Sequence, residues 1–265
     1  VYYEGFPGFP RRLAFAPLLE LFPLARRVSG TWGIFSPLII FSVIGFAYFL
    51  QTKVSFSLGI ANFVWLFFGS VLLAQGIPLD NAYLGARKAN LLRFGAYTGI
   101  ALMMVYTGRR YYWNVVTSTF GARRMSETPR YVVWCGRLFL LTSVGAVYML
   151  YRSGLPVFWG AAFIILLYLS LAVLCRMVVE AGVFYIQPFW MPVGVLVALA
   201  GFEAMGPTLY AILAMASIML AGDPRTTVMP FISNGLHMVD AKTDRGSARI
   251  LPAVAGMVVL GFLVA

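Results

Sequence analysis

The sequence has 265 residues, of which 61% are hydrophobic and only 11% are charged, and its formal net charge is +11. A water-soluble domain could not bury so large an apolar surface, so the composition excludes the soluble classes and indicates a membrane protein. The Lys and Arg residues cluster between apolar runs, where they meet anionic headgroups, so the positive charge does not indicate a nucleic-acid partner.

The first 32 residues combine Pro, Gly and aromatic residues with two arginine pairs. This mixture is typical of a segment that lies along the membrane surface with its rings at headgroup depth. The segment lacks the charged start, apolar centre and small-residue cleavage site of a signal peptide. We therefore expect residues 1–32 to be an interfacial or extramembrane segment.

The rest of the chain consists mainly of apolar runs that predict membrane-spanning helices, since about 20 helical residues cross the roughly 30 Å of a bilayer's hydrocarbon core. These runs are residues 34–50, 54–76, 91–108, 131–151, 155–175, 189–203 and 208–222. Residues 33–222 are therefore predicted to form an all-α, polytopic integral membrane bundle of about seven or eight transmembrane helices, with broken or re-entrant segments. Only three residues separate the first two runs, which leaves open whether both cross or one re-enters.

The bundle is followed by a polar stretch, residues 223–249, that we expect to be a cytoplasmic loop or an interfacial helix. Residues 250–265 are apolar but too few to span comfortably, which predicts the start of a truncated transmembrane helix in a fragment of a longer protein. If all seven runs cross, the short loops that share a side with residues 109–130 hold eleven Lys and Arg residues and the opposite loops hold four. The positive-inside rule then places residues 109–130 and 223–249 in the cytoplasm.

The sharpest chemical feature follows the uncharged run 155–175. Arg176 comes directly after it and Glu180 four residues later, one turn away on the same face of a continuing helix. An ionisable residue at membrane depth faces a partner, a cavity or a substrate path; the other reading is that the helix ends here, with the Arg at headgroups and the Glu in water. The stretch after Glu180 contains three helix breakers, Gly182, Pro188 and Pro192. They favour a helix that is interrupted and then resumed, as in transporters.

Glu203 lies between two apolar runs and is flanked by Gly201 and Gly206. If it is buried, its carboxyl group could carry a proton in a transport cycle; the other reading is a loop carboxylate in water. His237 is the single histidine and has no ligand partners at metal-binding spacing, so we expect no metal site. Nucleotide-binding and hydrolase motifs are missing from the sequence, so we expect no cofactor and no enzymatic activity.

Two stretches, PLIIFSVIGFAYFLQTKVSFSL at residues 37–58 and RMVVEAGVFY at residues 176–185, resemble an uncharacterised family of large bacterial polytopic membrane proteins. That family is distantly related to the oligopeptide-transporter superfamily, and the chain resembles its C-terminal half. The resemblance implies a multi-pass transporter fold in the bacterial inner membrane and, from the wider superfamily, proton-driven uptake of peptides or metal chelates. The residues of this sequence that match the family's motif positions are Arg176, Glu180 and Gly182. The Asn-Pro-Gly signature of oligopeptide transporters is absent from this sequence.

Together these features predict a secondary, proton-coupled transporter. Arg176 would hold an anionic group, Glu180 would pair with Arg176 or exchange protons, and Glu203 would be a second proton site near the breaks at Gly201 and Gly206. The alternative is a non-catalytic helical subunit of a larger membrane complex. The expected partners are membrane lipid, a small-molecule substrate and other membrane subunits.

Overall fold

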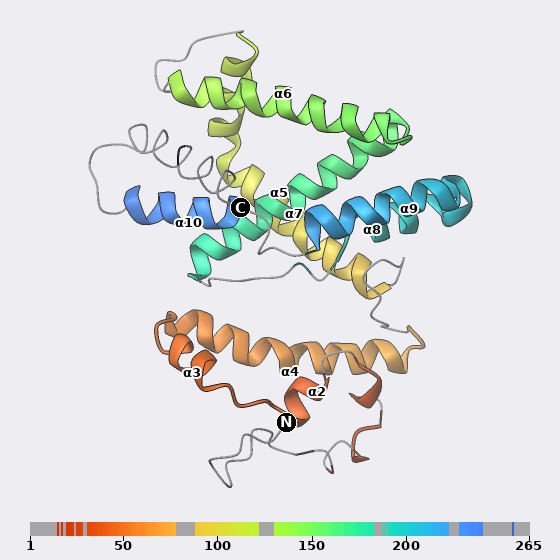
Figure 1. Ribbon diagram of the computed structural model, residues 1–265. Helices are drawn as coiled ribbons and strands as arrows, with labels where there is room; N and C mark the ends of the chain where they lie inside the picture. The colour runs from red at the N-terminus through yellow and green to blue at the C-terminus, as the bar shows by residue number, and fades with distance from the viewer. Residues whose placement is uncertain are drawn as a thin grey trace, which may run out of the picture. The chain divides into compact units, whose positions relative to one another are not determined.

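The computed structural model describes residues 15, 17, 20–23, 25–28, 31–77, 88–121, 130–182, 188, 190–222, 228–240 and 256. Within these ranges the regular elements are helices, and no β-strand is present, as the all-α prediction requires (Figure 1). The chain forms two compact units, one of residues 1–82 with 87–89 and the other of residues 83–86 with 90–265.

The first unit contains a short 3-10 helix, η1 (Ala25–Arg27), and the helices α2 (Thr31–Phe35), α3 (Phe41–Ala47) and α4 (Thr52–Ala74). The 23 residues of α4 match the second predicted run and are enough to cross a bilayer. The first predicted run, residues 34–50, instead contains the last two residues of α2 and all of α3, and these helices, of five and seven residues, are too short to cross. Pro37 follows α2 and cannot continue a helix, because it lacks an N–H group.

The second unit begins with the 32-residue helix α5 (Lys88–Thr119), which extends the third predicted run through Arg109 and Arg110. Its C-terminal end is held by the next helix, α6 (Arg130–Arg152), since Arg137 Nε donates a hydrogen bond to the carbonyl oxygen of Thr119 at 3.4 Å. A cation at this end also opposes the negative pole of the α5 dipole.

A short turn joins α6 to α7 (Val157–Ala181), so the two helices pack as an antiparallel pair. The helices are in van der Waals contact at Gly160, where an added Cβ atom would lie 3.6 Å from the Cβ atom of Leu150. Further along, the hydroxyl groups of Ser143 and Tyr168 are 3.0 Å apart and form a hydrogen bond between the two helices. Such bonds contribute to helix association where lipid surrounds a protein.

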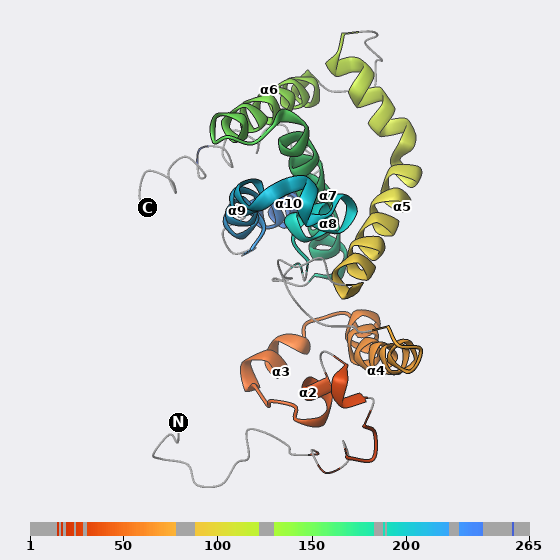
Figure 2. The same cartoon turned by 90° about the vertical axis from the view of Figure 1, so that its right-hand side faces the viewer.

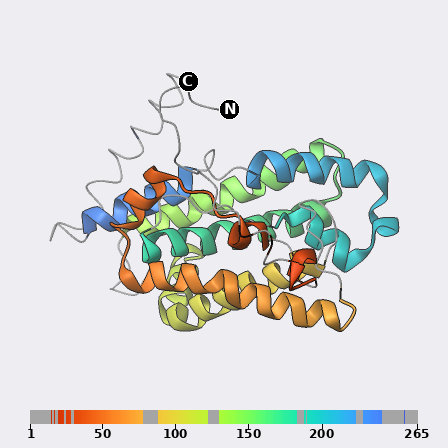
Figure 3. The same cartoon turned by 90° about the horizontal axis from the view of Figure 1, so that it is seen from below.

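Three helices complete the second unit: α8 (Pro192–Ala200), α9 (Phe202–Ala221) and α10 (Val228–Asp240). Figures 1 and 3 show that α8 runs back along α7 and that α9 turns to run beside α8 in the opposite direction. The sixth predicted run therefore contains a helix of only nine residues. Gly201 (φ 85°, ψ 150°) separates α8 from α9, and Gly206 (φ 71°, ψ 166°) kinks α9. Such backbone angles are essentially restricted to glycine.

The core of the second unit lies around α7, which contacts α6, α8, α9 and α10 (Figure 2). Its centre is formed by fully or nearly fully buried side chains of α7, α8 and α9, including Phe163, Leu167, Val193, Leu196 and Leu213. The uncharged run predicted at residues 155–175 thus forms the central helix of the second unit. The apolar surface that α7 buries is the main source of order there.

Among the residues that the structure describes, four helices are long and apolar enough to cross a membrane: Thr52–Ala74, Tyr131–Arg152, Val157–Ala181 and Phe202–Ala221. The predicted count of seven or eight is not confirmed. α5 is long enough but less apolar, because Arg, Tyr, Thr and Gly residues interrupt its run. α10 lies in the stretch predicted as a polar loop or interfacial helix, whereas the predicted helix at residues 250–265 falls outside the described residues apart from Gly256.

Candidate functional site at the end of α7

Arg176 and Glu180 form an ion pair on the last two turns of α7, between Arg176 Nη2 and Glu180 Oε1. The sequence analysis predicted that the two side chains share a face, and the structure confirms it. Both side chains are about half exposed, at 53% and 57% of their surface. An exposed pair of this kind contributes only about 0–1 kcal/mol to stability, so it can open at little cost.

Gly182 ends α7. It adopts the left-handed conformation (φ 66°, ψ 18°), and its N–H group donates to the carbonyl oxygen of Val178 at 3.0 Å. A glycine at this position accepts the left-handed angles without the steric cost that a side chain would bring. The next helix begins only at Pro192, and the described residues between them are not helical. The predicted interruption of the helix is therefore confirmed.

The start of α8 is buried, and its backbone donors are taken up by the protein. Pro192 has no N–H group, and the N–H group of Val193 donates to the hydroxyl oxygen of Ser217 on α9 at 3.3 Å. The N–H groups of Gly194 and Val195 both donate to the carbonyl oxygen of Met191, at 3.1 and 3.4 Å. This helix terminus is thus closed by protein atoms and does not offer these donors to an anion.

Trp190 lies in the interruption, two residues before α8, and none of its surface is exposed. Its ring meets two aromatic rings of α5 edge-on, with centroids 5.2 Å from Phe94 and 5.6 Å from Tyr97. Its indole Nε1 has no hydrogen-bond acceptor in the described part of the chain. A buried donor without an acceptor costs about 1–3 kcal/mol, and most buried polar groups avoid that state.

The sequence analysis did not identify Trp190 or Ser217. For Trp190 a weak signal was present, since an aromatic donor between Pro188 and Pro192 falls where the backbone cannot be helical. For Ser217 there was none, because its partner Val193 is 24 residues away in the sequence.

Glu203 lies in the first turn of α9 and is exposed. Figures 1 and 3 show that the connection between α8 and α9 lies at one end of the second unit and the C-terminal end of α7 at the other. The structure therefore does not bring Glu203 together with Arg176 and Glu180. Among the described residues no group of three His, Cys, Asp or Glu side chains could hold a metal ion.

Comparison with known proteins gives no match among the curated proteins and none among the solved structures. A family model does match, over residues 1–265, and its description is a family of unknown function, DUF6785. Because the match extends over the whole chain, the chain belongs to the DUF6785 family.

Proposed function

We propose that the protein is a multi-pass membrane protein that works as a secondary, proton-coupled transporter. The observation that carries this proposal is that α7 ends at Gly182 and that Pro188, Trp190 and Met191, just before α8, are buried and lie outside any helix. The nine residues of α8 extend about 14 Å, roughly half of the 30 Å hydrocarbon core.

Non-helical backbone is tolerated at membrane depth only where protein surrounds it or where it lines a water-filled cavity. Trp190 and Met191 meet the first condition, since both are buried. Transporters use such interrupted helices to bind their substrates. The interruption therefore favours transport.

The indole N–H group of Trp190 supports a binding role for this region. A substrate with a carbonyl or carboxylate oxygen would supply the acceptor that the described residues do not. Peptides and metal chelates, the substrate classes suggested by the resemblance to the oligopeptide-transporter superfamily, both carry such oxygens.

The exposed ion pair supports the proton coupling. An anionic group of the substrate could replace Glu180 beside Arg176, and Glu180 could then take up a proton without leaving a net charge unpaired. Because the pair is exposed and weak, this exchange would be inexpensive. Glu203, at the other end of the second unit, is the second proton position in this proposal.

Uptake measurements in proteoliposomes test the proposal. A pH-sensitive dye inside the vesicles reports proton entry when di- and tripeptides, or metal chelates, are added outside under an imposed pH gradient. We expect substrate-dependent proton entry in the unaltered protein and its loss in Glu180→Gln. The matched control is Glu20→Gln, which changes an exposed carboxylate of the first unit and should leave proton entry unchanged. Unchanged proton entry in Glu180→Gln would remove Glu180 from the mechanism.

The second candidate function is a non-catalytic helical subunit of a larger membrane complex. One observation favours it: α6 has no buried residue between positions 131 and 152, and α4 buries only Gly69. These apolar surfaces could contact partner helices as well as lipid. Purification in mild detergent distinguishes the two functions, since a subunit should co-migrate with fixed partners and a transporter of this kind should not need them.

A further inference from the structure

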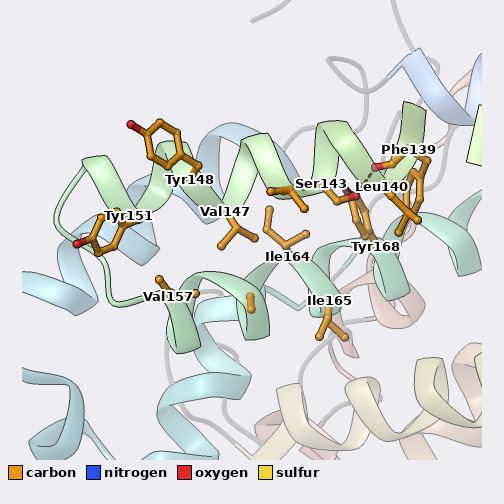
Figure 4. Close-up of a pocket in the computed structure, with 12 residues that line it drawn as sticks. Phe139, Leu140, Ser143, Val147, Tyr148, Tyr151, Val157, Ile164, Ile165 and Tyr168 are labelled. Atoms are coloured by element: carbon orange, nitrogen blue, oxygen red, sulfur yellow. Dashed lines mark hydrogen bonds between the residues drawn. The ribbon is translucent and has the colours of Figure 1, made fainter. Parts of the chain in front are cut away.

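An open apolar groove runs along the antiparallel pair of α6 and α7 (Figure 4). Its volume is about 580 Å³, and its walls are almost entirely carbon. Tyr148, Tyr151 and Val157 lie at the end next to the turn between the helices, and the hydrogen-bonded pair of Ser143 and Tyr168 lies at the other end. None of the four residues singled out in the sequence analysis lines it.

The groove has the length of one membrane leaflet. On α6 its lining extends from Phe139 to Tyr151, about 18 Å at 1.5 Å per residue. One leaflet contributes about 15 Å of the hydrocarbon core. The turn that joins two crossing helices must lie at a membrane surface, so the groove would run from that surface to the middle of the bilayer and end there at Phe139 and Tyr168.

The groove can hold a single acyl chain. A chain of methylene groups is roughly 4–5 Å across, given carbon contact distances of 3.5–4.0 Å, and an apolar volume of about 580 Å³ has room for one such chain.

A cation close to one end of the groove complements a phospholipid headgroup. Arg152 is the last residue of α6, directly after Tyr151, and its side chain is exposed. A guanidinium group binds phosphate oxygens through paired N–H donors. Tyrosine rings are favoured at this depth, where one end of the ring is apolar and the hydroxyl group meets water or headgroups.

We infer that the groove between α6 and α7 is a binding site for one phospholipid, with an acyl chain between Tyr151 and Phe139 and the phosphate beside Arg152. The inference rests on the proposed membrane location of the two helices but not on transport. Inside a bilayer the bound lipid exchanges with others of similar polarity, so only packing and the headgroup contact favour it. The preference should therefore be modest, on the order of fivefold.

Photocrosslinking in proteoliposomes tests the inference. The probe is phosphatidylglycerol with a diazirine in the middle of one acyl chain, and the crosslinked positions are read by mass spectrometry. Val144 lines the groove and Leu141 lies on the same helix outside it, and both are 70% exposed. We expect about fivefold more labelling at Val144 and Ile165 than at Leu141, since packing in the groove prolongs the contact.

Substitutions separate the groove from ordinary lipid contact. Val144→Trp fills the groove and should remove the excess labelling at Ile165, whereas Leu141→Trp, its matched control at equal exposure, should not. Arg152→Gln should lower the labelling severalfold, and Arg110→Gln, an exposed arginine of α5, should leave it unchanged.

Each outcome has a distinct meaning. Equal labelling of Val144 and Leu141, or equal effects of the two Trp variants, would overturn the lipid site. Labelling of Leu141 without labelling of the groove residues Val144 and Ile165 would overturn it as well. That result would show that another part of the protein covers the groove. Absence of label on both faces of α6 would overturn the proposed membrane location itself.

Discussion

Replacing Ser217 by alanine should destabilise the second unit by about 1–2 kcal/mol. The Ser217 hydroxyl accepts the hydrogen bond from the N–H group of Val193, and both residues are completely buried. In Ser217→Ala that N–H group keeps no acceptor, and water does not reach it. Leaving a buried donor unsatisfied costs about 1–3 kcal/mol. The donor-acceptor distance of 3.3 Å is slightly longer than usual, which places the loss in the lower part of that range.

The assay is reversible unfolding in mixed detergent micelles, with increasing dodecyl sulfate and the helical circular dichroism as the signal. Ser153→Ala is the matched control, because its hydroxyl also forms a hydrogen bond with the backbone, here as the donor to the carbonyl oxygen of Met149 at 3.1 Å, but is exposed. The control should change the free energy of unfolding by less than about 0.5 kcal/mol. Equal losses in Ser217→Ala and Ser153→Ala would refute the account of how the start of α8 is stabilised.

Three further predictions use the same preparation. Gly206→Ala should lower the free energy of unfolding by about 1–3 kcal/mol, since φ 71° and ψ 166° suit only glycine. Gly235→Ala, in the helical and unobstructed part of α10, should be neutral or stabilising by up to about 1 kcal/mol, and a loss equal to that of Gly206→Ala would contradict this reasoning. Tyr168→Phe should cost about 0.5–1.5 kcal/mol by removing the hydroxyl that joins α6 and α7, and no loss would mean that this bond does not stabilise the pair. Arg137→Gln should speed hydrogen exchange in the last turn of α5, where Arg137 holds the carbonyl group of Thr119 and contributes about 0.3–1 kcal/mol; unchanged exchange would argue against that cap.

The helices that the sequence predicted best are those with a long uncharged run and a clear stop signal. The uncharged run begins at residue 155, and Gly182 is the stop signal after it. The structure shows one helix, Val157–Ala181, that ends at this glycine. The short length of α8 also had signals in the sequence, since Pro192 begins it and Gly201 ends it. Apolar composition alone was less informative: residues 34–50 are as apolar as a spanning helix, yet they contain the end of α2 and all of α3, separated by Pro37.

The candidate site was only partly visible in the sequence. The pairing of Arg176 and Glu180 follows from their spacing, because residues four apart share a helix face. The surroundings of Trp190 do not follow from spacing, since its neighbours Phe94 and Tyr97 come from a helix almost a hundred residues earlier. Contacts of this kind depend on how distant helices pack, and local patterns carry no information about them.

The central claim is that the protein is a transporter. The most direct test is to measure whether the interruption between α7 and α8 opens to water during a transport cycle. Met191→Cys, with Cys135 and Cys175 replaced by alanine, places a thiol in the buried interruption, and Leu213→Cys places one in the equally buried core of α9. The rate of modification by a membrane-impermeant thiol reagent is measured in proteoliposomes, with and without an imposed pH gradient. The account predicts that the thiol at position 191 reacts and that the gradient changes its rate, while the thiol at position 213 stays inert. Equal inertness at both positions would contradict a transport role and favour a static membrane subunit.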